Sequence, residues 1–474
     1  YNITFGRIIV IDANNNTFNM TYKIDGGKLY FEPENFTIDK LAFPIVIDPA
    51  IVFGNEIVLD DYFDPGDFIL YNVDTLDENK VIICYATSTS SKAVVGIINN
   101  NTISLCTPTI FHPSRQSAIT VTALNSTKFV VAYEKYNDSV GGYVVKLKVG
   151  IINDDNSITF GDETTVSLDG QYTIAMDNLT NDKIVIAYKN HIRVCTISGT
   201  SVTLHSEYAF TSSSVDFVGL TVLNSNRVLI CWGNNCRVGT ISGTSITFGS
   251  VYSYTAHNYP GSISVTRLND EKALRAYGNA VGGYYYPYGR VITTNNLEIS
   301  FGSPHNLVPV EPSYVEGTPV IKSFNETRAI LCIGAYSSKA IYEHIDGTTI
   351  TYSLIETFNP SPSKHISLAT LNNNTFVIVY KDEATGKGEA IVGTVWFETN
   401  PPTSSINPVS QYWYTTNITL TATATDTESG VANVSLYYCF SLDNSTWSDW
   451  TLYGTDTDGS DGWNWTFDFP DGMG

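Results

Sequence analysis

The stretch Leu76-Asp-Glu-Asn-Lys-Val-Ile-Ile-Cys-Tyr85 is the first copy of a ten-residue phrase that recurs along most of the chain. Each copy joins the end of one strand, through a polar turn rich in Asn and Asp, to a β-branched strand that mostly ends on an aromatic residue. Successive copies begin 44 to 56 residues apart, and the other six are Leu124–Tyr133, Leu179–Tyr188, Leu223–Trp232, Leu268–Tyr277, Phe324–Ile333 and Leu371–Tyr380. A period of this length indicates an array of one supersecondary unit.

Other strands recur around the phrase. A short strand precedes it, and a strand carrying Val-Gly follows it, at Val95-Gly96, Val149-Gly150, Val238-Gly239 and Val392-Gly393. A fourth strand reads Ile-Thr-Phe-Gly or a close variant, at 158–161, 246–249 and 299–302. Four strands in each of seven repeats resemble the seven-bladed β-propellers, which implies an all-β fold over residues 50–399. The resemblance implies no activity, because propellers carry many functions.

The seventh repeat supplies only three strands before Pro401-Pro402. The missing fourth strand is at the other end of the array, where Ile51-Val-Phe-Gly54 matches the Ile-Thr-Phe-Gly strand and has no repeat of its own. We therefore predict that residues 51–59 complete the seventh blade by pairing with the strand at Ala390–Phe397. Such a joint removes the sheet edges that an open array would expose.

The composition excludes some classes of function. The chain of 474 residues carries 47 acidic and 26 basic residues, a net charge of −21, and only 15% of its residues are charged. A nucleic-acid-binding protein needs a basic footprint, which this balance does not provide. No apolar run approaches the length of a membrane span. Abundant Asn, Ser and Thr favour an exported protein with a well-solvated surface.

Two segments flank the repeats. Residues 1–49 form an N-terminal β segment with strands predicted at Gly6–Ile11, Thr17–Ile24 and Lys28–Phe31. The motif Phe43-Pro-Ile-Val-Ile-Asp-Pro49 resembles the closing strand of β-sandwich modules in prokaryotic surface proteins. The segment is therefore interpreted as the tail of such a sandwich or as a cap on the propeller.

Residues 400–474 form a third unit. Ile418–Thr425 alternates with period two, 431–440 and 446–453 predict a hairpin, and Trp463–Phe469 places four aromatic residues on one face. Together with Ala424-Thr-Asp-Thr-Glu-Ser-Gly-Val431, these motifs resemble the immunoglobulin-like modules of archaeal cell-surface proteins. The match covers about 75 residues, fewer than the roughly 100 of a full sandwich, so we expect an incomplete module.

Fourteen Asn-x-Ser/Thr sequons predict a glycoprotein, although a chain this rich in Asn, Ser and Thr shows some by chance. Their asparagines are Asn2, Asn15, Asn19, Asn35, Asn100, Asn125, Asn137, Asn178, Asn325, Asn373, Asn417, Asn433, Asn444 and Asn464. Of the seven cysteines, Cys84, Cys231 and Cys332 share one position of the phrase, where other copies have Ala or Val. These three are expected to be buried free thiols. No disulfide pairing follows from the spacing of the remainder.

Arg275 departs from the phrase, because the other copies place an aliphatic residue there. The structural interpretation is a salt bridge to a neighbouring carboxylate, and the functional one is a ligand-binding arginine in the central channel. Speculative binding residues also lie in Gly282-Gly-Tyr-Tyr-Tyr-Pro-Tyr-Gly289. Tyr284, Tyr285, Tyr286 and Tyr288 either stack on sugars or anchor a protein contact, or pack against the next blade.

Acidic clusters in the C-terminal unit suggest calcium as a cofactor. Asp456, Asp458 and Asp461 surround a glycine turn, and Asp426 and Glu428 precede Ser429-Gly430. Oxygen-rich loops of this kind bind calcium, but solvated turn residues have the same composition. The seven histidines form no close ligand pair, so no other metal site is predicted.

The sequence favours an extracellular structural or adhesive protein, a subunit of an archaeal surface layer or filamentous appendage. We expect no enzyme, since no nucleophile elbow, phosphate-binding loop or dinucleotide fingerprint occurs. The alternative is a secreted propeller that binds or cleaves carbohydrate. The expected partners are glycans and other copies of the same chain, joined head-to-tail, with the β-prone residues 1–11 donated as a strand to the open C-terminal module of the next subunit.

Overall fold

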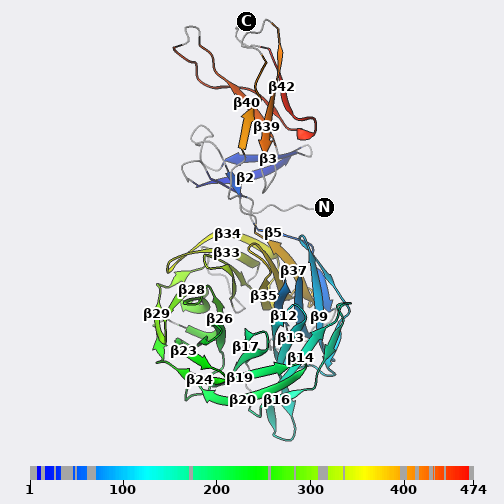
Figure 1. Cartoon of the computed structure of the whole chain (residues 1–474), viewed down its shortest axis with the longest axis vertical. Helices are drawn as coiled ribbons and strands as arrows, with labels where there is room; N and C mark the ends of the chain where they lie inside the picture. Colours follow the sequence, from blue (N-terminus) through cyan, green and yellow to red (C-terminus); the bar gives the residue numbers. More distant parts are fainter. Residues whose placement is uncertain are drawn as a thin grey trace. The chain divides into compact units, whose positions relative to one another are not determined.

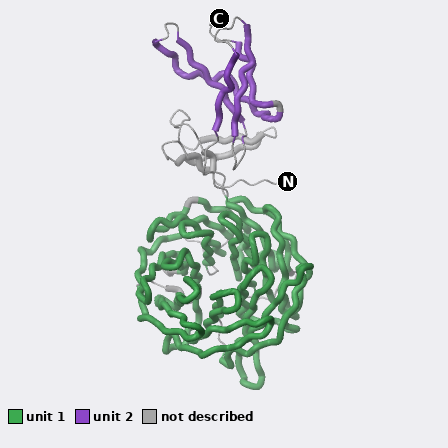
Figure 2. The backbone as a smooth tube through the Cα atoms, in the orientation of Figure 1, with its two compact units in different colours: residues 1–7, 50–396 green, residues 8–49, 397–474 purple. Residues whose placement is uncertain are grey.

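The computed structural model divides into two compact units, which Figure 2 distinguishes by colour. Unit 1 comprises Tyr1–Arg7 and Ala50–Trp396, and unit 2 comprises Ile8–Pro49 and Phe397–Gly474. The residues described are 8–11, 17–25, 28–33, 46–48, 51–60, 71–169, 174–254, 258–281, 284–307, 319–334, 337–395, 403–410, 416–425, 431, 433–441 and 445–468. Only the backbone is described for residues 8–48, 60, 258–262, 279–281, 284–285, 353 and 461.

The described part of unit 1 contains seven antiparallel sheets, numbered here in chain order. Sheet 1 consists of β7 (Tyr71–Asp77), β8 (Lys80–Ala86), β9 (Ser91–Asn99), β10 (Thr102–Leu105) and β11 (Thr109–His112). Sheet 2 consists of β12 (Ser117–Asn125), β13 (Lys128–Asn137), β14 (Gly142–Ile152), β15 (Ile158–Phe160) and β16 (Thr164–Ser167). Sheet 3 consists of β17 (Ile174–Thr180), β18 (Lys183–Tyr188), β19 (His191–Ser198) and β20 (Ser201–Ala209).

The remaining sheets follow the same order of strands. Sheet 4 consists of β21 (Gly219–Asn224), β22 (Arg227–Trp232), β23 (Asn235–Ser242), β24 (Ser245–Phe248) and β25 (Tyr252–Ser253). Sheet 5 consists of β26 (Asn258–Arg267), β27 (Lys272–Val281), β28 (Tyr284–Asn295), β29 (Glu298–Phe301) and β30 (His305–Asn306). Sheet 6 consists of β31 (Val320–Asn325), β32 (Arg328–Ile333), β33 (Ser338–Asp346) and β34 (Thr349–Asn359). Sheet 7 consists of β35 (Ser363–Thr370), β36 (Thr375–Asp382), β37 (Gly388–Thr394), β5 (Val52–Phe53) and β6 (Ile57–Asp60).

The sheets close into a ring. The first strand of each sheet contacts the first strand of the next, from β7 through β12, β17, β21, β26 and β31 to β35, and β35 contacts β7. Figure 1 labels β12, β17, β26 and β35 around the centre of the ring. The ring is joined where Thr394 of β37 pairs with Val52, and Ala390 pairs with Ile57. A ring of radially arranged antiparallel sheets is the architecture of a β-propeller.

The glycine of the fourth strand marks a joint between neighbouring sheets. A Cβ added at Gly161 would lie 2.5 Å from Cβ of Thr200 and 2.7 Å from its carbonyl oxygen, in the outer turn of sheet 3. Gly54, Gly249 and Gly302 meet the corresponding turn of their own next sheet in the same way. Only glycine lets the backbones approach this closely, which explains why the Ile-Thr-Phe-Gly strand ends on it.

The apolar core lies between the sheets. The β-branched second strand of the phrase is inaccessible to solvent in β8, β13, β18 and β22, since Val81–Cys84, Phe129–Tyr133, Ile184–Ala187 and Val228–Cys231 are completely buried. Glycines of the third strand make room for its larger side chains, because a Cβ at Gly150 would lie 2.2 Å from the ring of Phe129. The glycine of the Val-Gly strand therefore leaves space for the large side chain that lies opposite it.

The described part of unit 2 contains three sheets. One has the order β3-β2-β1-β4 and is formed by β1 (Ile8–Ile11), β2 (Thr17–Asp25), β3 (Lys28–Pro33) and β4 (Val46–Asp48). The second joins β38 (Thr403–Ile406), β39 (Ile418–Thr425) and β42 (Trp463–Phe467), and the third joins β40 (Val434–Tyr438) and β41 (Thr451–Asp456). A short 3-10 helix, η2 (Gly459–Asp461), precedes β42.

Unit 2 bears on two expectations. The segment 8–49 falls into one unit with residues 397–474, whereas the two were predicted to be separate segments whose ends meet only between subunits. Strand β1 pairs with β2 on one side and with β4 on the other, so Ile8–Ile11 is an inner strand of its own sheet and has no free edge to donate. Residues 8–11 are thus already paired on both edges within this chain, residues 1–7 lie outside the described residues, and the strand exchange between subunits stays a prediction. No helix in the described part of the chain has the length and apolar character of a membrane span.

Candidate functional site

The first strands of the sheets carry a set of polar side chains, the inner belt, whose hydrogen bonds join most of the sheets to a neighbouring sheet. A first strand has an unpaired edge, and its N–H groups need acceptors. In sheet 3, Asp177 Oδ2 accepts from the Val222 N–H of sheet 4 (2.7 Å). The same arrangement joins Asn72 to the Val121 N–H (2.9 Å), Asp74 to the Ala123 N–H (2.8 Å), Ser264 to the Ile321 N–H (3.1 Å), Thr266 to the Ser323 N–H (3.2 Å) and Ser367 to the Val73 N–H (3.0 Å).

A second series of bonds runs back to the preceding sheet. The Thr75 hydroxyl of sheet 1 donates to the Thr370 carbonyl of sheet 7 (2.8 Å), which again crosses the joint of the ring. Asn178 Nδ2 donates to the Ala123 carbonyl (3.0 Å), Ser323 to the Arg267 carbonyl (2.5 Å) and Thr370 to the Ser323 carbonyl (3.0 Å). The inner belt therefore satisfies backbone groups around the centre of the ring.

Two residues of the inner belt, Asp177 and Lys322, carry opposite charges, and the charge of Lys322 acts on the pKa of Asp177. Burial raises the pKa of Asp177, and the nearby Asp74 acts in the same direction, while bonds from the Val222 and Asn178 N–H groups and the charge of Lys322 act to lower it. Lys322 occupies the belt position that Asp74, Asp177 and Thr266 hold in their sheets. An ammonium group only donates, so Lys322 cannot accept the N–H of the next sheet as those residues do.

One cavity of about 560 Å³ opens where the belt meets the polar turns of the phrase. It is lined from five sheets, with Asp177 and Asn178 from sheet 3, Thr221 and Asn224 from sheet 4, Arg267 and Asp270 from sheet 5, Lys322 from sheet 6 and Thr370 from sheet 7 among its residues. Arg267 donates to Asp270 Oδ1 (2.7 Å), and both side chains are largely exposed. The cavity therefore has two cations and two carboxylates on a polar wall, which can bind a small polar molecule.

Three tyrosine–glutamate pairs recur elsewhere in unit 1. The aromatic residue that ends the phrase donates its hydroxyl to a glutamate of the fourth strand or the turn after it. The pairs are Tyr133 with Glu163 (2.5 Å), Tyr380 with Glu56 (2.7 Å) and Tyr188 with Glu207. Glu163 and Glu56 each lie two residues after the Gly of the fourth strand, a spacing visible in Gly161-Asp-Glu and Gly54-Asn-Glu. Sequence reasoning missed these pairs, although this repeated spacing signals them.

The pair in sheet 2 has the richest electrostatics. Glu163 Oε1 lies 3.1 Å from Lys146 Nζ and 3.4 Å from Lys135 Nζ, and Glu163 Oε2 lies 4.0 Å from His112 Nε2. Burial acts to raise the pKa of Glu163, but hydrogen bonds from Tyr133 and Lys146 and the two lysine charges outweigh it and lower the pKa to about 2. Burial and the bond to Glu163 raise the pKa of the Tyr133 phenol. A tyrosine–carboxylate pair repeated in three sheets indicates a role in packing.

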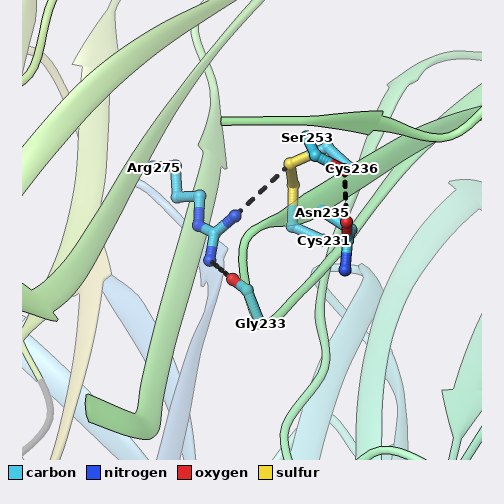
Figure 3. Close-up of a disulfide and its surroundings, with 6 residues drawn as sticks. All are labelled: Cys231, Gly233, Asn235, Cys236, Ser253 and Arg275. Atoms are coloured by element: carbon cyan, nitrogen blue, oxygen red, sulfur yellow. Dashed lines mark hydrogen bonds between the residues drawn. A yellow bond between two sulfur atoms is a disulfide. The ribbon is translucent and has the colours of Figure 1, made fainter. Parts of the chain in front are cut away.

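Arg275 contradicts both interpretations drawn from the sequence. Its side chain is only 1% exposed, so it lines no channel, and it forms no ion pair with a described carboxylate. The guanidinium lies 5.2 Å from the ring centroid of Tyr254 and 5.5 Å from that of Tyr277. It donates to the Gly233 carbonyl and, at 3.5 Å, to Cys236 Sγ, as Figure 3 shows. Cation–π contacts and a carbonyl take the place of the expected carboxylate.

The cysteine beside Arg275 corrects a second expectation. Cys231, expected to be a free thiol, forms a disulfide with Cys236 across the hairpin of β22 and β23 (Figure 3). Cys84 and Cys332 are buried free thiols as predicted, and burial raises their pKa. The sequence signal is the two-residue turn Gly233-Asn234, which makes Cys231 and Cys236 direct neighbours in an antiparallel pair.

The speculative tyrosines are partly resolved. Tyr288 is half-buried, with its ring centroid 6.2 Å from that of Tyr277. Tyr277 belongs to the same sheet, so this ring contact lies within sheet 5, and the expected packing of the tyrosines against the next blade stays a prediction. Tyr286 is half-buried as well, and the side chains of Tyr284 and Tyr285 lie outside the described residues.

The calcium predictions remain untested. Asp456 Oδ1 accepts from the Asp458 N–H (3.0 Å), its Oδ2 accepts from the Asn464 N–H (2.9 Å), and Asp458 Oδ1 accepts from the Ser460 N–H (3.0 Å). No group of three potential metal ligands occurs among the described residues. The side chain of Asp461 and the residues 426–430, which include Asp426 and Glu428, lie outside them.

The sequons differ in how available their asparagines are. Asn100, Asn373, Asn417 and Asn433 are exposed. Asn125 and Asn325 occupy the same place in two phrases, and their Oδ1 atoms accept from the hydroxyls of Thr127 (3.0 Å) and Thr327 (3.1 Å). Asn178 is different, because its Nδ2, the atom that would carry a glycan, is used in the inner belt.

Glu343 is a further residue that sequence reasoning missed. It lies opposite Ala329 at the position where Gly150 lies opposite Phe129 and Gly393 opposite Phe376. Its side chain is 0% exposed, and neither carboxylate oxygen has a hydrogen-bond partner among the described residues. Burial raises its pKa well above the ordinary value of 4.5. The signal in the sequence is a glutamate in the glycine position of the Val-Gly strand.

Comparisons with known proteins identify no family. No protein-family model and no curated protein matches the chain. Among solved structures, the N-terminal domain of Nup159 is 10% identical with a TM-score of 0.45, over 73% of this chain and 96% of that one. The Swd1 β-propeller domain of Myceliophthora thermophila is 9% identical with a TM-score of 0.44, over 72% and 100%. The NanB sialidase of Streptococcus pneumoniae is 9% identical with a TM-score of 0.41, over 82% and 83%. These similarities are too weak to carry a function, and the fold assignment rests on the strand pairing.

Proposed function

We propose that this chain is an extracellular structural or adhesive protein, a subunit of an archaeal type of surface layer or filamentous appendage. In this proposal each of the seven sheets is one blade of a seven-bladed propeller, and residues 397–474 contain an immunoglobulin-like module. The chain works by presenting a rigid ring and an exposed β surface, and it performs no chemistry.

The observation that carries the proposal is the use made of the polar residues at the centre of the ring. Asp74 and Asp177, the carboxylates of the inner belt, each accept a backbone N–H from the next sheet. A hydrolase needs carboxylates free to exchange protons with substrate or water. Here they are acceptors in the joints between sheets, which supports a role in rigidity.

The exposed surface supports the extracellular assignment. Asn100, Asn373, Asn417 and Asn433 present their amides to solvent, as glycan attachment requires. Asn178 serves as an internal control, since a glycan there would cost its bond to the Ala123 carbonyl. Asn178 is exposed too, but its Nδ2 is bonded, so glycopeptide mass spectrometry of the native protein is expected to find glycans on Asn100, Asn373, Asn417 and Asn433 and none on Asn178.

The experiment that tests the function is electron microscopy of the native material on the cell surface. The proposal predicts this chain in an ordered lattice or filament, which antibody labelling identifies. A freely diffusing secreted protein, or one confined to the cytoplasm without glycans, would contradict it.

A carbohydrate-binding role is the second candidate, favoured by exposed aromatic residues on β40 and in the segment just before β41. Trp450 is 71% exposed, Trp447 59% and Tyr437 47%, and Leu452 lies opposite Tyr437 in the strand pairing. Exposed aromatic faces stack on sugar rings. Retention on a polysaccharide column that is lost in Trp450→Ala, but not in Trp232→Phe at a buried site of unit 1, would favour this role.

A further inference from the structure

Lys322 is the residue of the inner belt whose placement the joints between sheets do not explain. The residues at the equivalent position of other sheets accept a backbone N–H from the following sheet. These residues are Asp74, Asp177 and Thr266. The side chain of Lys322 makes no hydrogen bond and no ion pair with any described residue, yet it lines the cavity. A lysine held beside a ring of packed strands loses conformational freedom and hydration. In the described structure no direct contact compensates for that loss.

Asp177 and Lys322 carry opposite charges and both line the cavity. They belong to sheets 3 and 6, which are three sheets apart in a ring of seven, so they line opposite walls of the cavity. The two charges interact electrostatically without forming an ion pair. Asp74 lies near Asp177 and makes that side of the centre more negative. Arg267 and Asp270, the other two charged residues of the lining, pair with each other, which leaves Asp177 as the negative wall and Lys322 as the positive wall of a cavity of about 560 Å³.

We propose that the cavity binds a small zwitterion, a free α-amino acid, with its ammonium group toward Asp177 and its carboxylate toward Lys322. A molecule with one charge would satisfy one wall and leave the other unpaired, whereas a zwitterion pairs both. The volume lies within the range of small-molecule sites. The side-chain amide of Asn224 and the hydroxyl of Thr221, both from sheet 4 beside the sheet that carries Asp177, add polar groups to the lining of the cavity. This binding does not depend on the surface role proposed above.

The test is isothermal titration calorimetry of the full chain with the twenty free L-amino acids. At least one is expected to give a saturable heat. Its N-acetylated form, which lacks the ammonium, and its amide, which lacks the carboxylate, are each expected to bind at least tenfold more weakly. Absence of a saturable heat with every amino acid up to about 10 mM, well above a weak dissociation constant of about 1 mM, would overturn the proposal.

Variants assign the two walls. Lys322→Met removes the positive wall and Asp177→Asn the negative one, while Asn keeps an oxygen that accepts the Val222 N–H and so preserves the joint. Both are expected to lose binding at least tenfold. Lys339→Met, in the same sheet as Lys322 but bonded to Thr357 outside the cavity, is the control and should bind as the wild type does. Unchanged binding in Lys322→Met, or equal binding of either singly charged analogue, would show that the site recognises something else.

Discussion

Replacing Glu343 with methionine is expected to stabilise the protein at neutral pH. The side chain is 0% exposed and neither of its oxygens has a described partner. Leaving a buried polar group unsatisfied costs about 1–3 kcal/mol. Methionine has a similar length, no polar atoms and enough flexibility to fill the same space. The change should therefore raise the free energy of unfolding by about 1–3 kcal/mol, since it removes that penalty and leaves the packing filled.

The pH dependence gives this prediction its sign. Burial raises the pKa of Glu343 in the folded protein well above the ordinary value of 4.5, so between the unfolded and the folded pKa the folded state binds a proton that the unfolded state has released. The stability that this proton confers is complete below the unfolded pKa and is lost as the pH rises through the folded pKa. The wild type should lose up to about 1.4 kcal/mol per pH unit in that interval. The advantage of Glu343→Met should therefore be smallest at pH 4 and grow toward pH 7.

Urea unfolding followed by tryptophan fluorescence at several pH values measures both effects. Glu298→Met, at an exposed position in sheet 5, is the matched control and should change the stability little at any pH. A loss of stability in Glu343→Met at pH 7, or a difference that does not vary with pH, would show instead that Glu343 is charged and paired in the folded protein.

Three further changes probe the repeated contacts and the metal. Tyr133→Phe removes the hydroxyl that bonds Glu163 and should lower the free energy of unfolding by about 1–2 kcal/mol. The control Tyr136→Phe, on an exposed ring, should leave it almost unchanged. Equal effects of the two changes would show that the Tyr133–Glu163 pair does not stabilise the protein. Gly161→Ala places a Cβ within 2.5 Å of Thr200 and should lower the free energy of unfolding by about 1–3 kcal/mol. The same change at Gly142, which has open space around it, should not lower it. If Gly161→Ala is neutral, the close contact between sheets 2 and 3 at Gly161 is not as described. If calcium binds near Asp456, Asp458 and Asp461 or near Asp426 and Glu428, chelation should lower the melting temperature of unit 2 alone, and an unchanged thermogram would exclude that site.

Much of unit 1 was predictable because the same strand and turn pattern can be compared across its seven repeats. The polar turn and apolar strand of the phrase recur at the same positions, so strands β8, β13 and β18 follow from the pattern alone. The position of the closing strand followed from a count, since the seventh repeat lacks the strand that Ile51–Gly54 resembles. A repeat thus provides several independent readings of each position.

The residues that depart from the pattern were harder to interpret. The aliphatic column identifies Arg275 as unusual, but its partner ring Tyr254 comes from the loop after sheet 4, and nothing in the sequence brings the two together. Cys231 resembled Cys84 and Cys332 in its column, and only its pairing across a two-residue turn distinguishes it. The bonds of Asp177 run to a neighbouring sheet 45 residues further along, so a reading of one repeat at a time misses them.

The ring of unit 1 closes through the pairing of β5 and β6 with β37. A cysteine pair at Val52 and Thr394, which face each other in the pairing of β5 with β37, tests it most directly. Under mild oxidation the doubly substituted chain should form a disulfide between them, seen by mass spectrometry as one linked peptide that joins two distant parts of the chain. A pair at Val52 and Lys387, out of register, should not link. Absence of the first link in folded protein, or equal linking of both pairs, would contradict the closure.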